Sequence, residues 1–581
     1  MATESSAPRL PPKADWTGQG QRCYPTAKMT DRNTQVPAAR ARPLPRPDLW
    51  SLGAFAIALV VLAPMASVVW IAFHPTENIW PHLVSTVLPR YLSNTLILML
   101  GVAVLTAAVG TGAAWLTTMY RFPGRVWLDY ALLFPLAIPA YVGAYALVDF
   151  LQYAGPVQSG LRGLMGWESA RDYWFFPVRS RGMAIIVLSA ALYPYVYLLA
   201  RAAFREQSGC SYEVARALGC GPWRLFGRVG LPLARPAIAT GVALALMETV
   251  ADYGTVQHFG VQTLTTGIFS TWLNGNNAGG AAQIAGVVLT LILLLVGMER
   301  ISRRNARFHR VGRSGRPVEP MHLNPAQGWL ATALCLIPFS VGFILPVAVM
   351  GWHALRRPEV WLSPGLLQAL TNTLVTGGVA AVVTVAAALF LVYGLRMVNH
   401  TAARWVLPVT TLGYAAPGAV LAVGILIPLA ALDHKLADAV LAVTGWDPGL
   451  MLTGTAAALV LAYAVRFFGV AQGAVDTAFG RISPSLPMAA RSLGRTPGGA
   501  LRAVHLPLMR GSVATALLVV FVDCVKELPA TLLLRPFNYN TLATRVFELA
   551  SLERLQEAAP AALMVMAVGL LAVAMLARAN R

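Results

Sequence analysis

The sequence predicts an all-α integral membrane protein with about twelve transmembrane helices, arranged as two parallel repeats of six. Three observations lead to this fold class. The 581-residue chain is 56% hydrophobic and only 12% charged, which is more apolar than typical soluble domains. Apolar runs of roughly 20 residues, long enough to cross a hydrocarbon core, recur along the chain. A polar stretch that separates two of these runs occurs again in the other half of the sequence.

The predicted transmembrane helices follow the apolar runs in chain order. We expect them at residues 50–73, 92–119, 128–151, 182–204, 233–254, 279–299, 327–352, 369–397, 404–432, 449–473, 510–534 and 556–577. Residues 1–49 are rich in Pro, Arg, Ser and Thr, which predicts a disordered cytoplasmic tail. The predicted domains are this tail, a first half at 50–299, a basic cytoplasmic linker at 300–326 and a second half at 327–581.

The net charge of +20 comes almost wholly from arginine, and its placement indicates membrane topology rather than nucleic-acid binding. Loops that face the cytoplasm carry an excess of Lys and Arg. If the N-terminus is cytoplasmic, the arginine-rich segments all lie on that side: Arg40, Arg42, Arg46, Arg121, Arg125, Arg216, Arg224, Arg228, Arg235 and seven arginines from Arg300 to Arg316. We therefore expect both termini in the cytoplasm, contact with membrane lipid and no nucleic-acid partner.

The five cysteines form no CxxC pair and have no partner histidines at ligand spacing. We therefore expect no disulfide framework and no structural metal. No cofactor is predicted, and any metal ligands remain unknown at this stage.

The polar stretch at residues 215–236 is repeated at 490–511, an offset of 275. Ten of the twenty-two aligned residues are identical, which indicates duplication. An offset of 278 pairs Asn94-Thr95-Leu96 with Asn372-Thr373-Leu374, and Thr263-Leu264 with Thr541-Leu542. Each half therefore has six spans. An even number of spans gives both halves the same orientation, so both polar stretches emerge on the cytoplasmic face.

The polar stretch predicts a compact helical knob between the fourth and fifth spans. Ser211 is a candidate N-cap and Glu213 lies in the first turn of a short helix. Gly219 suits a left-handed turn, Pro222 can begin a second short helix, and Pro232 marks the return into the bilayer. The alternative is an amphipathic loop whose arginines touch lipid headgroups. The duplicated spacing of Gly and Pro favours the knob, since headgroup contact needs no fixed backbone geometry.

These stretches resemble the EAA loop of binding-protein-dependent ABC importer permeases of the type I fold. The matching residues are Glu213-Val214-Ala215, Gly219 and Val229-x-Leu231-Pro232, and then Met488-Ala489-Ala490, Gly494 and Val504-x-Leu506-Pro507. The resemblance implies type-1 permease cores at about 90–299 and 368–577, within a bacterial inner membrane. The ATPase-coupling residues it implies are Glu213, Ala215, Leu218, Gly219, Pro232, Met488, Ala489, Ala490, Leu493, Gly494 and Pro507.

The resemblance also implies partners: two copies of an ABC ATPase subunit, one docked on each loop, and a periplasmic substrate-binding protein. The chain contains no G-x-x-x-x-G-K-[ST] motif, so we expect a transport subunit that does not itself hydrolyse ATP. Val214 and Met488 depart from the family pattern, in which Ala and Glu are usual. The two docking sites are therefore expected to be unequal.

The two halves also share acidic residues near the end of the fifth span. Asp252 and Glu527 are 275 residues apart, and Glu248 and Asp523 lie one helical turn before them. Charged groups at membrane depth are costly and are functional candidates by default, so these four residues are candidates for the substrate pathway. The alternative is that they cap helix ends or pair with cations.

The depth of these carboxylates is also predicted. At about 1.5 Å per helical residue from Pro232, Asp252 is expected near the outer mouth of the pathway, and Lys526 is expected to neutralise Glu527 in part. Tyr193, Tyr195 and Tyr197 are candidate phenolate ligands, but tyrosines near span ends usually anchor at the interface, which we expect here.

The segments around these acids resemble the ferric-iron permeases, a fused double-permease branch of the same family. They read "ADYGTVQHFGVQTLTTGIFSTW" and "KELPATLLLRPFNYNTLATRVFELAS". The resemblance implies ferric iron as substrate. Permeases for thiamine, phosphonate, sulfate and polyamines are similar and remain alternatives. An ion-coupled secondary transporter also commonly has two six-span halves, but matching cytoplasmic knobs have no role in it.

Overall fold

The computed structural model describes residues 49–75, 77–304, 319–397 and 401–579. The predicted tail, apart from residue 49, and most of the linker lie outside the described residues. Eleven helical runs in the described part of the chain are long and apolar enough to cross a membrane. A twelfth is counted if the bent pair 125–137 and 140–165, which meets at 95°, is one span. The predicted all-α membrane fold with about twelve spans is confirmed.

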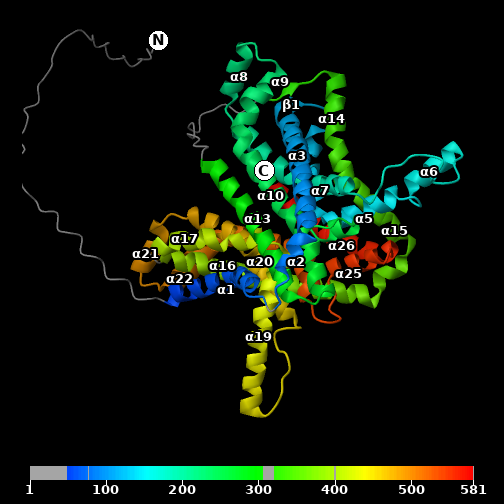
Figure 1. Cartoon of the computed structure of the whole chain (residues 1–581). Coiled ribbons are helices and arrows are strands. Elements are labelled where there is room, and N and C mark those ends of the chain that lie inside the picture. The colour runs from blue at the N-terminus through cyan, green and yellow to red at the C-terminus, as the bar shows by residue number, and fades with distance from the viewer. Residues whose placement is uncertain (1–48, 76, 305–318, 398–400, 580–581) are drawn as a thin grey trace, which may run out of the picture. The chain divides into compact units, whose positions relative to one another are not determined.

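The first half consists of its membrane spans and of short elements between them (Figure 1). Its long or broken spans are α1 (Leu49–Phe73), α3 (Leu88–Met119), α4 (Arg125–Ala131) with η1 (Phe134–Ala137), α5 (Ala140–Leu151) and α6 (Pro156–Met165), α7 (Arg181–Glu206), α10 (Leu231–Ala251) and α13 (Ala278–Arg304). Its short elements are α2 (Trp80–Ser85), β1 (Tyr120–Arg121), α8 (Gly209–Ala217), α9 (Pro222–Leu225), η2 (Phe226–Gly230), α11 (Gly254–His258), α12 (Leu264–Phe269) and η3 (Ser270–Asn274).

The second half repeats this order. Its long or broken spans are α14 (Pro325–Phe339) with η4 (Ser340–Ile344) and α15 (Leu345–Arg356), α16 (Pro364–Met397), α17 (Thr401–Thr410) with α18 (Leu412–Ala415) and α19 (Gly418–Thr444), α20 (Ala456–Gly480), α23 (Leu506–Val525) and α26 (Leu555–Ala579). Its short elements are β2 (Met321–His322), η5 (Pro358–Leu362), α21 (Ser485–Ser492), α22 (Pro497–Ala500), η6 (Leu501–His505), α24 (Pro529–Leu534) and α25 (Leu542–Ser551). Strands β1 and β2 form one parallel two-residue pair.

The parallel repeat is visible in individual hydrogen bonds. In the first half the backbone N–H of Leu264 donates to Thr95 Oγ1 at 3.1 Å. At the positions 278 residues later, the N–H of Leu542 donates to Thr373 Oγ1 at 2.8 Å. Helices α12 and α25 also begin with the same capping box, formed by a threonine N-cap and a threonine three residues later. The repeated residues therefore form the same local structure in both halves.

The first span of each half packs against the other half. Helix α1 contacts α16 and α19 as well as α13, while α15 contacts α5 and α26 (Figure 1). Ala54, Ala58 and Val61 of α1 share one buried cluster with Ala381 and Val385 of α16. Each half therefore covers apolar surface of the other, and the halves interlock.

The ninth and tenth spans differ from their predicted ranges, 404–432 and 449–473. The chain breaks at Pro417, the N-cap of α19, and α19 then continues to Thr444. The reason lies in Asp433, which is buried and whose carboxylate accepts hydrogen bonds from the backbone N–H groups of Met451 and Leu452, both at 2.9 Å. Because this acid is satisfied by the following loop, the helix extends beyond the apolar run and the tenth span begins later.

Candidate functional site

The repeated polar stretch folds into a helix–turn–helix knob. Helix α8 ends at Ala217, and the turn after it contains Gly219, which has a φ of +80°. The N–H of Cys220 donates to the carbonyl of Ala215 at 3.0 Å, and the N–H of Gly219 donates to that of Arg216 at 2.9 Å. These two bonds form a Schellman motif, in which glycine adopts the left-handed conformation without strain. Pro222 then begins α9, as predicted.

The second knob has the same geometry. Gly494 has a φ of +82°. The N–H of Arg495 donates to the carbonyl of Ala490 at 3.1 Å, and the N–H of Gly494 donates to that of Arg491 at 3.0 Å. All of these positions are 275 residues after their counterparts in the first knob. The duplicated sequence therefore produces a duplicated turn.

Each knob sits on a similar aromatic socket. Trp115 of α3 contacts Phe204 and Tyr212, with ring centroids 5.2 Å and 6.0 Å away. In the second half Tyr393 contacts Phe479 at 6.0 Å, and these two residues match Trp115 and Phe204 in the repeat. In the first half, ring packing of Trp115 with Tyr212 fixes α8 to the second span. In the second half, the Tyr393 hydroxyl donates to the carbonyl of Pro497, at the start of α22, at 2.7 Å.

The outward surfaces of the knobs expose apolar side chains beside arginines. Leu218 is 79% exposed and its repeat partner Leu493 is 84% exposed, while Trp223 is 86% and Met488 is 67% exposed. Glu213, Gly219, Ala489, Gly494, Pro232 and Pro507 are also exposed, Ala490 is half-buried and Ala215 is buried. Exposed apolar clusters of this kind mark interaction surfaces. The predicted coupling residues are therefore mostly accessible on the knobs, whereas Ala215 is buried beneath them.

One local prediction for the first knob is wrong. The N-cap of α8 is Ser208, not Ser211, and α8 begins at Gly209. A continuous helical run extends from residue 222 to 251 through Pro232, and entry into the bilayer at Pro232 stays a prediction. Proline lacks an N–H group and disturbs a regular helix. The π-turn η2 directly before Pro232 absorbs this disturbance, so the helix continues.

All four predicted pathway acids line one central cavity of about 140 Å³ between the two halves. Glu248 and Asp252 come from the end of α10, and Asp523 and Glu527 from the end of α23. The break of the third span at Pro139 also lines this cavity. Asp252 lines this cavity together with residues of α5 and α11. Its position near the outer mouth of the pathway stays a prediction.

Two of the acids cap short helices, as the alternative prediction held. Asp252 Oδ1 accepts hydrogen bonds from the N–H groups of Thr255 at 3.0 Å and Val256 at 3.1 Å. Glu527 accepts from the N–H groups of Ala530 at 2.9 Å and Thr531 at 3.0 Å. Both carboxylates thus face the N-terminus of the helix that follows them, where negative charge is favourable.

The cation partners differ from the prediction. Lys526 does not neutralise Glu527; its Nζ lies 3.0 Å from Asp523 Oδ1. Glu527 instead pairs with Arg466 of α20, whose Nη1 lies 2.8 Å from Glu527 Oε1. Side chains on adjacent helical residues point in different directions, so Lys526 reaches the acid one turn away on its own face.

Sequence reasoning missed Arg466, and it placed the tyrosines wrongly. Arg466 is a charged residue within an apolar span, which was the signal that could have identified it. Tyr195 lines the cavity and is not an interfacial anchor. Tyr193 and Tyr197 are fully buried in helix packing, so they are not interfacial anchors either. Tyr141 and Tyr414 also line the cavity.

A second polar cavity of about 350 Å³ lies at the end of α7 opposite to α8. One ion pair and one histidine–carboxylate hydrogen bond cross it from the first half to the second. Arg179 lies 3.2 Å from Glu553, and Asp149 lies 2.8 Å from His353. Burial and the nearby Arg179 lower the pKa of His258 to about 4, so this ring is neutral near pH 7.

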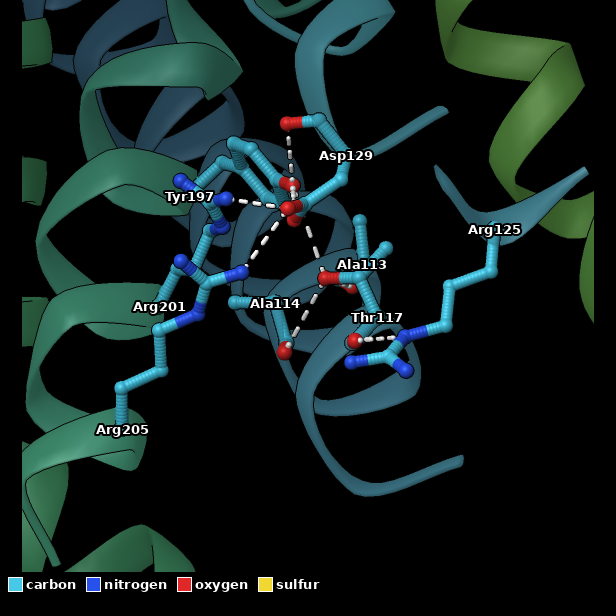
Figure 2. Close-up of polar contacts among 8 residues, drawn as sticks. All are labelled: Ala113, Ala114, Thr117, Arg125, Asp129, Tyr197, Arg201 and Arg205. Atoms are coloured by element: carbon cyan, nitrogen blue, oxygen red, sulfur yellow. Dashed lines mark hydrogen bonds and ion pairs between the residues drawn. The ribbon is translucent and has the colours of Figure 1, made fainter. Parts of the chain in front are cut away.

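A buried charge cluster ties α4 to α7 (Figure 2). Asp129 is paired with Arg201, and its Oδ2 lies 2.8 Å from Nη2 of Arg205. The hydroxyl of Tyr197 donates to the Asp129 carbonyl at 3.0 Å. The second half makes the equivalent tie without charge, through Gln472. These residues were also missed, and they hold the first segment of the broken third span in place.

In the second half, Gln472 Nε2 donates to the carbonyl of Leu407 at 2.7 Å. Gln472 matches Tyr197 at an offset of 275, and Leu407 matches Asp129 at an offset of 278. The same contact is therefore made by different residue types in the two halves.

Two interlocked six-helix halves, a charged cavity between them and a matched knob in each half define a membrane permease. The profile described as binding-protein-dependent transport system inner membrane component matches residues 107–307. The chain belongs to this family: it is a fused double-domain permease subunit of a binding-protein-dependent ABC importer, a multi-pass transport component of the inner membrane.

Three relatives show the breadth of the family. The Fe(3+)-transport system permease protein FbpB 2 of Haemophilus influenzae is 27% identical over 484 residues, 81% of this chain and 86% of the relative. The molybdenum transport system permease protein ModB of Escherichia coli K12 is 31% identical over 206 residues, 33% of this chain and 85% of the relative. The sulfate transport system permease protein CysT of the same strain is 25% identical over 260 residues, which are 44% of this chain and 90% of the relative.

Proposed function

We propose that this chain passes ferric iron from a periplasmic binding protein across the inner membrane, driven by two cytoplasmic ATPase subunits. In this proposal both termini, the linker and both knobs are cytoplasmic. The halves at 50–299 and 327–581 contain type-1 permease cores at about 90–299 and 368–577. Each half offers one knob to one ATPase subunit.

The charge of the central cavity is the observation that carries the choice of substrate. Glu248, Asp252, Asp523 and Glu527 line the cavity against only two cations, Arg466 and Lys526. An excess of carboxylates favours a cation and disfavours an anion such as sulfate. Hard, highly charged cations prefer oxygen ligands, and tyrosine hydroxyl groups add to the carboxylates here. The name of the relative FbpB 2, which covers both halves, points to the same substrate.

The knobs support the proposed docking of ATPase subunits. Leu218 and Leu493 each extend an apolar side chain into solvent next to a left-handed glycine turn. An ATPase subunit with an apolar cleft, docked on each knob, would bury the exposed leucine of that knob. Because Glu213 in the first knob is matched by Met488 in the second, only the first knob can form a carboxylate contact, and the two docking sites are unequal.

The second cavity supports a route from the side opposite the knobs. It shares α5 and α11 with the central cavity: Tyr145 and His258 line the outer one, and Tyr141 and Gly254 line the central one. On each of these two helices, the residue that lines the outer cavity is one helical turn from the residue that lines the central cavity. The two cavities are therefore close to each other. Movement of the halves under ATP binding would open this separation and admit substrate.

Uptake into proteoliposomes tests the proposed function. The full-length chain is reconstituted with an ABC ATPase subunit and a periplasmic binding protein from the same organism, and radiolabelled ferric iron is supplied with ATP inside. We expect ATP-dependent iron uptake that excess molybdate and sulfate do not reduce. Glu248→Gln should lower uptake by more than about tenfold, because a cavity carboxylate is lost. Glu359→Gln, an exposed carboxylate in η5, serves as the control.

Uptake of sulfate or molybdate in place of iron would contradict the proposed substrate. Iron uptake that continues without any ATPase subunit, but stops when the proton gradient is removed, would instead identify an ion-coupled secondary transporter.

A further inference from the structure

The two halves differ in one respect where they line the central cavity. The acids are duplicated, since Glu248 and Asp252 match Asp523 and Glu527 at an offset of 275. The cations are not duplicated. Arg466 and Lys526 match Ala191 and Ala251 at the same offset, and both alanines line the cavity. The offset is structural as well, because α7 begins at residue 181 and α20 at residue 456.

The second half neutralises its own acids. Arg466 lies 2.8 Å from Glu527, and Lys526 lies 3.0 Å from Asp523. The Glu527 side chain is only 1% exposed. A carboxylate at such a depth is costly without a partner cation, and both acids of this half have one.

The first half contributes no cation of its own to the cavity. The cations that act on Glu248 are Arg466 and Lys526 of the second half, and both are already paired with acids of that half. Among the described residues, Glu248 has no hydrogen bond or ion pair, and Asp252 is bonded only to the start of α11. The small side chains of Ala191 and Ala251 stand where a guanidinium and an ammonium group would be. The hydroxyl of Tyr141, a residue that is 4% exposed and lines the same cavity, also has no hydrogen-bond partner.

We propose that the cationic substrate binds in the first half, where it takes the place that Arg466 and Lys526 occupy in the second. This inference rests on the proposed function and assigns its contact residues. Glu248 and Asp252 supply the negative charge, and the Tyr141 hydroxyl supplies a neutral oxygen. The tethered cations of the second half prevent four free carboxylates from acting together, which would hold a trivalent cation too tightly to release it.

Placing a lysine or arginine side chain at one of the two alanine positions of the first half tests the inference. Ala251→Lys places in the first half the residue that the second half has at 526, one turn after an acid. We expect it to pair with Glu248 and to lower iron uptake by more than about tenfold, because the substrate's place is taken. Ala251→Met adds similar bulk without charge, so its uptake should exceed that of Ala251→Lys at least several-fold.

Binding is measured separately with terbium, a trivalent cation whose luminescence is sensitised by nearby tyrosine. The full-length protein in detergent should give saturable luminescence that Ala251→Lys and Glu248→Gln abolish and Ala251→Met largely retains. Equal terbium binding and equal uptake by the Lys and Met variants would overturn the inference. If Ala251→Lys fails to fold, loss of terbium binding in Glu248→Gln supports the inference and retention overturns it. If the unaltered protein binds terbium as expected but takes up no iron, the proposed substrate fails and the assigned site stands.

Discussion

Arg466 and Glu527 form a buried ion pair that joins α20 to the segment between α23 and α24. Their side chains are 11% and 1% exposed. A Cβ atom at Gly418 would meet both the guanidinium and the carboxylate, so a glycine at the start of α19 gives the pair its space. Removing one member of a buried pair leaves an unpaired charge, which costs more than replacing both members.

We therefore expect Arg466→Met to destabilise the protein by about 3–5 kcal/mol and to lower its melting temperature in detergent. The double variant Arg466→Met/Glu527→Gln should recover most of the loss, because no unpaired charge remains. Thermal unfolding monitored by intrinsic fluorescence measures both.

The exposed pair of Arg396 with Asp476 is the control. Its side chains are 40% and 45% exposed, so Arg396→Met should cost no more than about 1 kcal/mol. An equal loss in the two single variants, or no recovery in the double variant, would contradict a buried ion pair.

At the scale of elements, the knobs are duplicated in backbone geometry but not in side chains. Each short helix ends in the same Schellman motif, on a glycine with φ near +80°. No atom lies within 4 Å of a Cβ built at Gly219 or Gly494. A larger residue there therefore meets no steric clash within this chain, and only the backbone conformation and a docked partner oppose it.

The variant Gly219→Val/Gly494→Val should therefore remain inserted and folded but lose the ATPase subunits. A β-branched residue at positive φ costs about 1–3 kcal/mol, which is enough to change the turn. We expect co-purified ATPase and iron uptake to fall by more than about tenfold. Gly351→Val in α15, also with open space around its Cβ, should leave both unchanged. Normal uptake by the double variant would refute the coupling role of the knobs.

At the scale of the whole molecule, the halves hold each other through their first spans. Helix α1 lies on α16 and α19, and α15 lies on α5. Tyr141 and Tyr145 of the first half share a buried cluster with Val349 and Met350 of the second. The two halves are therefore held together by extensive packing as well as by their covalent connection.

Two co-expressed fragments, residues 1–311 and 312–581, should therefore assemble. We expect an affinity tag on one fragment to purify both, because each half exposes apolar surface that only the other covers. Uptake by the assembled fragments should be within about threefold of the intact chain, since the cut removes only a connection. Fragments that insert but purify separately would show that the linker, not the packing, holds the halves together.

The sequence was sufficient to predict the spans, the repeat and the glycine turns. Each of these depends on features that can be read locally in the sequence. The spans follow from the length of the apolar runs, the repeat from identical residues at a fixed offset, and the turns from the conformational freedom of Gly219 and Gly494. The predictions failed where a tertiary contact changed the local outcome. Asp433 extends α19 because the following loop satisfies its carboxylate, and Lys526 pairs with Asp523 rather than with Glu527.

The amino-acid sequence by itself therefore determined that this protein has about twelve spans in two parallel halves, with four acids at matched positions. Only the tertiary structure decided which charges meet. Arg466 lies 61 residues before Glu527 and reaches it because α20 packs against α23. Lys526, next to Glu527 in the chain, points to Asp523 instead. Which charged residues pair depends on the directions in which packed helices point their side chains. A repeat pattern in the sequence does not give these directions.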